Sequence, residues 1–146
     1  MSTISCFEEI DVWQAARTLT KAVYKITQQG GFAKDFTLAR QLHAASVSTM
    51  SNIAEGFDSG SKAEFIHFLS YTRRSASEVQ SHLYVALDQD YITQEAFSDL
   101  YEQAQTVRKM VTSFMKYLRT EQASRRFNSS TRELANSRTR EPRNIS

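Results

Sequence analysis

The chain has 146 residues, of which 40% are apolar and 23% are charged, so one domain with a single core is expected. No apolar run approaches the roughly 20 residues needed to cross a bilayer, and the first residues lack the basic and apolar parts of a secretory signal. Cys6 is the only cysteine, which excludes an intramolecular disulfide and a cysteine-based metal site. These features predict a cytoplasmic protein with no membrane partner.

The net charge of +2 and the pI of 8.8 conceal an uneven distribution of charge. Residues 1–120 hold 12 basic and 13 acidic residues, whereas residues 121–146 hold six arginines and three glutamates. The second segment is rich in Ser, Asn and Arg and has few large apolar side chains, which is typical of disorder. We therefore predict a folded domain over 1–120, with a net charge of −1, and a disordered basic tail over 121–146.

Three breaks divide the first 120 residues into four segments: Gly30–Gly31, Gly56 with Gly60, and the polar stretch 88–93. Each segment has apolar residues at helical spacing. In chain order these are Val12, Ala16, Leu19, Val23 and Ile26; Leu38, Leu42, Ala45, Thr49 and Ile53; Phe65, Phe68, Thr72, Ala76, Val79, Leu83 and Ala86; and Phe97, Leu100, Ala104, Val107, Val111, Phe114 and Leu118. Short loops favour antiparallel neighbours, so the prediction is an all-α, up-down-up-down four-helix bundle.

The second break is predicted to be a corner between two helices. Gly56 is expected to take the left-handed conformation that ends a helix, and Ser61 with Glu64 matches the S-x-x-E capping box. Asn52 and Glu55 are three residues apart and can share a face, either as acid/base groups or as hydrogen-bonding partners of the loop. The structural interpretation is favoured, because no nucleophile or metal-binding set converges there.

The segment before this corner carries a second apolar stripe. Its members are Ala39, His43, Val47, Met50, Ala54 and Phe57. Trp13, Tyr24, Tyr101 and Met115 also lie off the main apolar positions of their segments. Because no helix is central in a four-helix bundle, a helix with two apolar faces is expected to be buried against another subunit. We therefore predict that the stripe forms an oligomer interface.

Metal and cofactor chemistry is not expected. His67 and His82 are fifteen residues apart on one predicted helix, too far to share an ion. The sequence has no H-E-x-x-H motif, and Glu64 with His67 gives E-x-x-H only once, whereas a di-iron bundle needs it twice. No catalytic residue, cofactor or small-molecule substrate is predicted, although a metal-binding or catalytic bundle remains the competing class.

Arginines are the candidate contacts for nucleic acid. Arg73 and Arg74 lie in mid-helix, where a solvated face, an intersubunit pair and an RNA-phosphate contact are all open. Arg40 is a third candidate in the folded part. The tail supplies six more, and we expect them to carry most of any affinity: Arg125, Arg126, Arg132, Arg138, Arg140 and Arg143.

Two stretches suggest a family. D-V-W-Q near the start, and S-N-I-A-E-G followed by S-x-x-E-F-x-x-F-L, resemble the four-helix-bundle proteins encoded in intervening sequences of 23S ribosomal RNA genes, over about residues 7–119. The superfamily includes accessory variability proteins of diversity-generating retroelements. The resemblance implies a homopentamer around a central channel, without enzymatic activity. In the retroelement branch it implies a partner of the reverse transcriptase that also contacts template RNA.

Several positions depart from the family pattern. Two basic residues common in the second helix are replaced by His43 and Ala44, and the corner after Phe57 has no arginine. Together the residues and the resemblance predict a non-enzymatic oligomeric scaffold that binds RNA, a partner protein or both. The alternative is an oligomerising protein with no nucleic-acid role, which fits the nearly neutral folded part.

Overall fold

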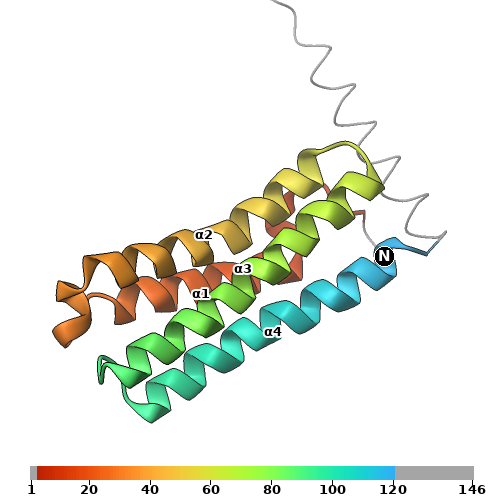
Figure 1. Ribbon diagram of the computed structural model, residues 1–146. Helices are drawn as coiled ribbons and strands as arrows, with labels where there is room; N and C mark the ends of the chain where they lie inside the picture. The colour runs from red at the N-terminus through yellow and green to blue at the C-terminus, as the bar shows by residue number, and fades with distance from the viewer. Residues whose placement is uncertain (1–2, 121–146) are drawn as a thin grey trace, which may run out of the picture.

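The computed structural model describes residues 3–120, and Figure 1 shows four long helices packed side by side with alternating direction. No strand occurs in this part of the chain, so the predicted all-α, up-down-up-down bundle is confirmed. The predicted tail at 121–146 lies outside the described residues. The elements are η1 (Phe7–Glu9), α1 (Asp11–Ile26), η2 (Gly30–Lys34), α2 (Phe36–Asp58), α3 (Lys62–Asp88) and α4 (Gln94–Leu118).

Side-chain caps fix where three of these helices begin. Asp35, Ser61 and Thr93 each accept a hydrogen bond of 3.0–3.1 Å from the backbone N–H three residues further on, which satisfies a donor that the first helical turn leaves free. The predicted cap at Ser61 is therefore confirmed. Asp90 has a left-handed φ of 58° and lets the chain turn sharply from α3 into α4. The loop between these helices contacts the start of α2, because the Tyr91 hydroxyl donates a hydrogen bond to the Asp35 carboxylate.

Small hydroxyl side chains lie where α2 packs against α1 and α3. The buried Thr72 hydroxyl of α3 donates to the Thr49 carbonyl of α2 at 3.1 Å, and the Thr20 hydroxyl of α1 donates to the Ser46 carbonyl at 3.0 Å. Each bond satisfies a buried polar group and crosses between two helices. The apolar core therefore contains a polar layer that helps to align α1, α2 and α3.

Gly56 has a different role from the one predicted. α2 continues past it to Asp58, and at this corner the glycine with a left-handed φ, of 87°, is Gly60. A Cβ atom on Gly56 would lie 2.8 Å from Phe68 Cβ and 3.0 Å from a ring carbon of Phe65. The prediction that Gly56 ends the helix is thus wrong, because the residue is needed inside α2 for the close approach of α3.

This close contact predicts an unusual result for Gly56→Ala. Glycine inside a helix normally costs roughly 0.5–1 kcal/mol relative to alanine, so the substitution would stabilise an uncrowded helix. Here the added methyl group must displace Phe68 or Phe65, and we expect the free energy of unfolding to fall by about 1–3 kcal/mol. Urea denaturation measures the change, with the exposed neighbour Glu55→Ala expected to stay within about 0.5 kcal/mol of the parent. A stabilised Gly56→Ala protein would contradict the crowding argument.

Candidate nucleic-acid interface

A hydrogen-bonded cluster joins α3 to α4 along the seam between them. Gln80 of α3 is 5% exposed, and its amide nitrogen donates to Gln105 Oε1 of α4 at 3.0 Å. Arg108 Nη1 donates to the side-chain oxygens of both Gln80 and Gln105, each at 3.1 Å. Two neutral amides therefore hold the Arg108 guanidinium in one position without neutralising its charge.

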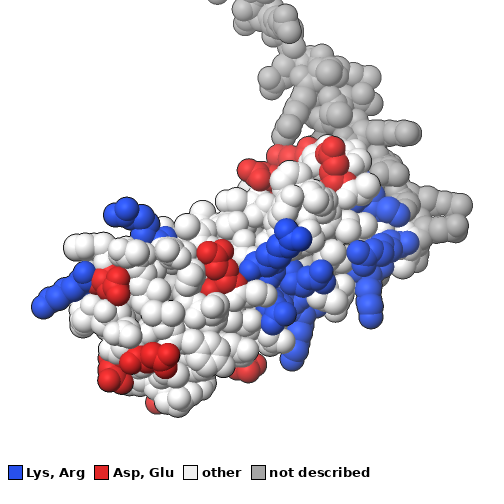
Figure 2. Space-filling model, viewed as in Figure 1, with Lys and Arg blue, Asp and Glu red and all other residues white. Residues whose placement is uncertain are grey.

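Other basic side chains extend from this cluster in one direction. Arg73 and Arg74 lie about two turns before Gln80 on α3, and Lys116 lies about two turns after Arg108 on α4. Because α3 and α4 are antiparallel, both shifts lead toward the same end of the bundle. Figure 2 shows Lys and Arg side chains gathered over α3 and α4 toward the end of α4. We call this set the basic face: Arg73, Arg74, Arg108, Lys109, Lys116 and Arg119.

Acidic residues are sparse on the basic face. Glu78, one turn from Arg74 on α3, is the nearest acidic residue along that helix, and its carboxylate is 3.3 Å from His82 Nε2. Most carboxylates of α3 and α4 lie near the loops. Figure 2 shows red clusters near both ends of the molecule and one red cluster at the edge of the blue group. The folded part thus separates its charges, although their sum is close to zero.

The predicted contact residues are only partly brought together. Arg73 and Arg74 lie on the basic face, and Arg74 packs its guanidinium 5.7 Å from the Tyr71 ring centroid. Arg40 is exposed on α2, which is not part of that face. The six tail arginines lie outside the described residues. They are Arg125, Arg126, Arg132, Arg138, Arg140 and Arg143.

Four members of the basic face were missed by the sequence analysis: Arg108, Lys109, Lys116 and Arg119. A signal was present, because Tyr101, Gln105 and Arg108 recur at helical spacing beside the apolar positions of the last segment. Net charge concealed it, since a total over 120 residues does not say which charges share a face.

The second stripe of α2 is buried inside the subunit to a larger extent than predicted. Phe57 is 2% exposed and belongs to the core, so its assignment to an oligomer interface is wrong. Ala39 and Met50 are half-buried and pack against the same core. Trp13 and Met115, whose off-stripe positions suggested a partner subunit, are 9% and 4% exposed. The reason is that α2 has α1 on one side and α3 on the other, so two of its faces are covered within the bundle.

The other members of the stripe differ in how far they are buried. The His43 ring stacks on Tyr24 at a centroid distance of 3.9 Å, and its Nε2 shares a hydrogen bond of 2.7 Å with the Thr27 hydroxyl. Burial lowers the pKa of His43, which favours the neutral imidazole. Ala54 is half-buried, whereas Val47 is 40% exposed. Val47 is therefore the large apolar residue of the stripe that remains available for another subunit.

The corner residues carry no arrangement for acid/base chemistry. Asn52 donates to the backbone and side-chain oxygens of Ser48, both at 2.9 Å, so the expectation that it binds loop amides is wrong. Glu55 is exposed. Within residues 3–120 no group of three or more His, Cys, Asp or Glu side chains is placed to hold a metal ion, and no helix there is long and apolar enough to cross a membrane.

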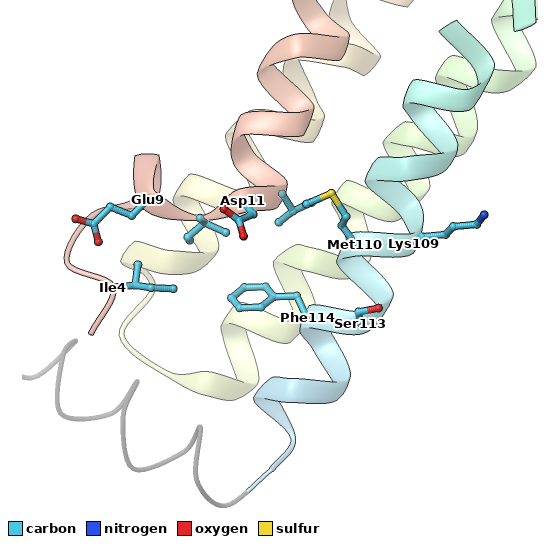
Figure 3. A pocket seen from close by; sticks show the side chains of 9 residues that line it. Ile4, Glu9, Asp11, Lys109, Met110, Ser113 and Phe114 are labelled. Atoms are coloured by element: carbon cyan, nitrogen blue, oxygen red, sulfur yellow. The ribbon is translucent and has the colours of Figure 1, made fainter. Parts of the chain in front are cut away.

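A hollow of about 470 Å³ lies between the N-terminal segment, the start of α1 and α4. In Figure 3 the side chains of Ile4 and Phe114 point toward each other across it, whereas Lys109 points away. Glu9 also borders it, but the backbone N–H and hydroxyl of Ser5 donate to that carboxylate and lower its pKa. The rest of the lining is mainly apolar, with Asp11 and Lys109 at its border, so the hollow is suited to hold an apolar group.

Two comparisons with known proteins match the folded part of the chain. The family model of the 23S rRNA-intervening sequence proteins matches residues 8–113. The chain belongs to this family. A crystal structure from Bacteroides thetaiotaomicron, of a protein with unknown function from the S23 ribosomal protein family, matches with a TM-score of 0.66 and 23% identity, over 72% of this chain and 98% of that one. At that identity the likeness shows the fold. No curated protein matches the chain.

Proposed function

We propose that this member of the 23S rRNA-intervening sequence family is a non-enzymatic oligomeric scaffold that binds nucleic acid on its basic face. The observation that carries the proposal is the group of Lys and Arg side chains that Figure 2 shows over α3 and α4 toward the end of α4. Six of the twelve basic residues of 1–120 fall in the two stretches 73–74 and 108–119 of the sequence. Clustered Lys and Arg attract a phosphate backbone and release its condensed counterions. Such contacts are made to the backbone of the nucleic acid and do not depend on its base sequence.

The position of Arg108 supports phosphate binding over a merely solvated face. Its Nη1 is held by two amide oxygens, which fixes the guanidinium at the seam between α3 and α4. A guanidinium that is fixed in place loses less conformational entropy when it binds an anion than a free side chain does. Arg73, Lys109 and Lys116 add charge around this fixed point.

The resemblance to retroelement accessory proteins supports RNA as the nucleic acid and a reverse transcriptase as a protein partner. It also supports a pentamer. In that assembly each subunit contributes one basic face and one arginine-rich tail, so several weak contacts can act on one strand together.

Loss of charge on the basic face should lower the salt dependence of binding. For a double variant with Arg74→Gln and Lys109→Gln, we expect the log–log salt slope for a single-stranded RNA to become shallower by about 1.4, because each neutralised phosphate contributes roughly 0.7. Fluorescence anisotropy over a salt series measures the slope. A matched variant with Lys21→Gln and Lys25→Gln removes the same charge from exposed positions of α1 and should change the slope much less. Equal effects of the two variants would contradict a localised face.

Ending the chain at Thr120 separates the contributions of the basic face and of the tail to nucleic-acid affinity. The prediction that the tail carries most of the affinity is untested, and its six arginines could add up to about 4 to the magnitude of the slope. We expect the shorter chain to keep its fold and salt-dependent binding from the basic face, and to lose the share of the tail. Complete loss of binding would contradict a role for the basic face, and unchanged binding would contradict a role for the tail.

Assembly gives a separate prediction. Val47 is 40% exposed on α2, and an unpaired charge in a dry interface is costly. We expect Val47→Asp to dissociate the oligomer while circular dichroism still shows a helical protein. Light scattering coupled to size exclusion measures the mass, with five subunits expected for the parent. Gln41→Asp, on another face of α2, is the matched control and should leave the mass unchanged. A parent protein that is monomeric at micromolar concentration would sink the scaffold proposal.

A further inference from the structure

An exposed aromatic ring stands at the end of the seam that leads to the basic face. Tyr84 of α3 is 51% exposed. Its ring centroid is 4.8 Å from that of Phe97 and 6.0 Å from that of Tyr101, both on α4. Phe97 is 7% exposed and anchored in the core. The Tyr84 ring is therefore braced by two rings from within the protein while about half of its surface faces solvent.

The Tyr84 ring lies along the same seam as the hydrogen-bonded cluster of Gln80, Gln105 and Arg108. Gln80 lies one turn before Tyr84 on α3, and Gln105 lies one turn after Tyr101 on α4. The Gln80 amide nitrogen is also 3.4 Å from the Tyr101 carbonyl oxygen, which ties the aromatic cluster to the glutamines. Along the seam, the exposed aromatic ring is followed by the largely buried amides, then by the guanidinium of Arg108, and then by the remaining cations.

An aromatic ring and cations along one seam correspond to the two kinds of group that every nucleotide carries, a base and a phosphate. An aromatic face stacks on a base, and every base has such a face, while nearby Arg and Lys side chains bind the backbone phosphates. A base inside a duplex already has both faces covered by its neighbours, so an exposed tyrosine gains little from a duplex. Phosphate binding alone explains the basic residues but gives no reason for an exposed braced ring beside them.

We propose that Tyr84 stacks on an unpaired base, so that the preferred ligand is single-stranded nucleic acid laid along the α3–α4 seam. This inference rests on the proposed function of the basic face and specifies its ligand. From Tyr101 to Arg119, 18 residues of helical rise give a length of about 27 Å. At a stacked rise of roughly 3.4 Å per nucleotide, that length accommodates up to about eight nucleotides.

Tyr84→Ala is the decisive substitution. We expect it to weaken binding of an eight-nucleotide single-stranded RNA by about 5- to 100-fold, the range that one base–aromatic stack supports. The log–log salt slope should stay unchanged, because no phosphate contact is lost. Tyr84→Phe keeps the ring and should bind like the parent. Phe36→Ala removes a side chain that is 72% exposed on α2, a helix that does not form the seam, and is the matched control.

Two further probes distinguish this inference from the proposed function. Single-stranded DNA and a duplex of the same sequence are measured with the parent and with Tyr84→Ala. Loss of affinity for both single strands, with little change for the duplex, is the expected result; loss for RNA alone would identify a ligand recognised through its 2′-hydroxyl. Equal binding of single strand and duplex, unaffected by Tyr84→Ala, would overturn the inference and leave the basic face standing. Absence of any binding by the parent at low salt would overturn the proposed function itself.

Tyr84→Ala could also act by loosening the packing around Phe97, and an abasic strand removes that ambiguity. With the unaltered protein, replacing the bases by abasic sites removes the stack and leaves the phosphates in place. We expect the same 5- to 100-fold weakening for this strand, and no further loss when Tyr84→Ala binds it. Equal affinity of the parent for the abasic and the normal strand would contradict base stacking.

Discussion

The hydrogen bonds of Gln80 across the α3–α4 seam constrain the rest of the surface. The short loop at 89–93 ties α3 to α4 at one end, and the Gln80 bonds fix the register further along the seam, where repeating apolar residues specify it only weakly. A one-turn shift would separate the Gln80 amide from Gln105 and Arg108, and a buried amide without partners costs about 1–3 kcal/mol. The register that these bonds select places Tyr84 beside Tyr101 at one end and Phe65 beside Phe114 at the other.

That register also explains how a folded part with a net charge of −1 can present a basic face. Salt screens charges over about 8–10 Å, so a phosphate senses the cations nearest to it and not the total. Glu78 lies one turn from Arg74, with its carboxylate 3.3 Å from His82 Nε2. The next acidic residue of α3 toward the loop, Asp88, lies 14 residues from Arg74, a rise of about 21 Å. Carboxylates near the loops therefore neutralise the protein as a whole without neutralising the basic face. For this bundle, the arrangement of charge is more informative than its sum.

The sequence was sufficient for the four helices, because each has apolar residues at helical spacing and a break at each end, and the Ser61 cap followed from its local motif. It was insufficient wherever the answer depended on which helix is the neighbour. Gly56 looked like a helix end because the approach of Phe68 is not visible in the chain. Phe57 looked like an interface residue for the same reason: an apolar side chain off the main positions is buried inside the subunit when a second helix covers it. The basic face was missed because it combines residues from two helices.

The burial of Phe57 inside the subunit changes which surface of α2 an oligomer interface would cover. With Ala39 and Met50 packed against the core and His43 stacked on Tyr24, α2 exposes less apolar area than its sequence pattern suggested. An interface on α2 would then be a polar surface around Val47, and polar interfaces owe more of their specificity to complementary charge and hydrogen bonds than to apolar area. Because the basic face lies on α3 and α4, contacts made through α2 would leave it open. Assembly would then multiply the basic face instead of covering it, and a strand that touches several copies would be held by their combined, individually weak contacts.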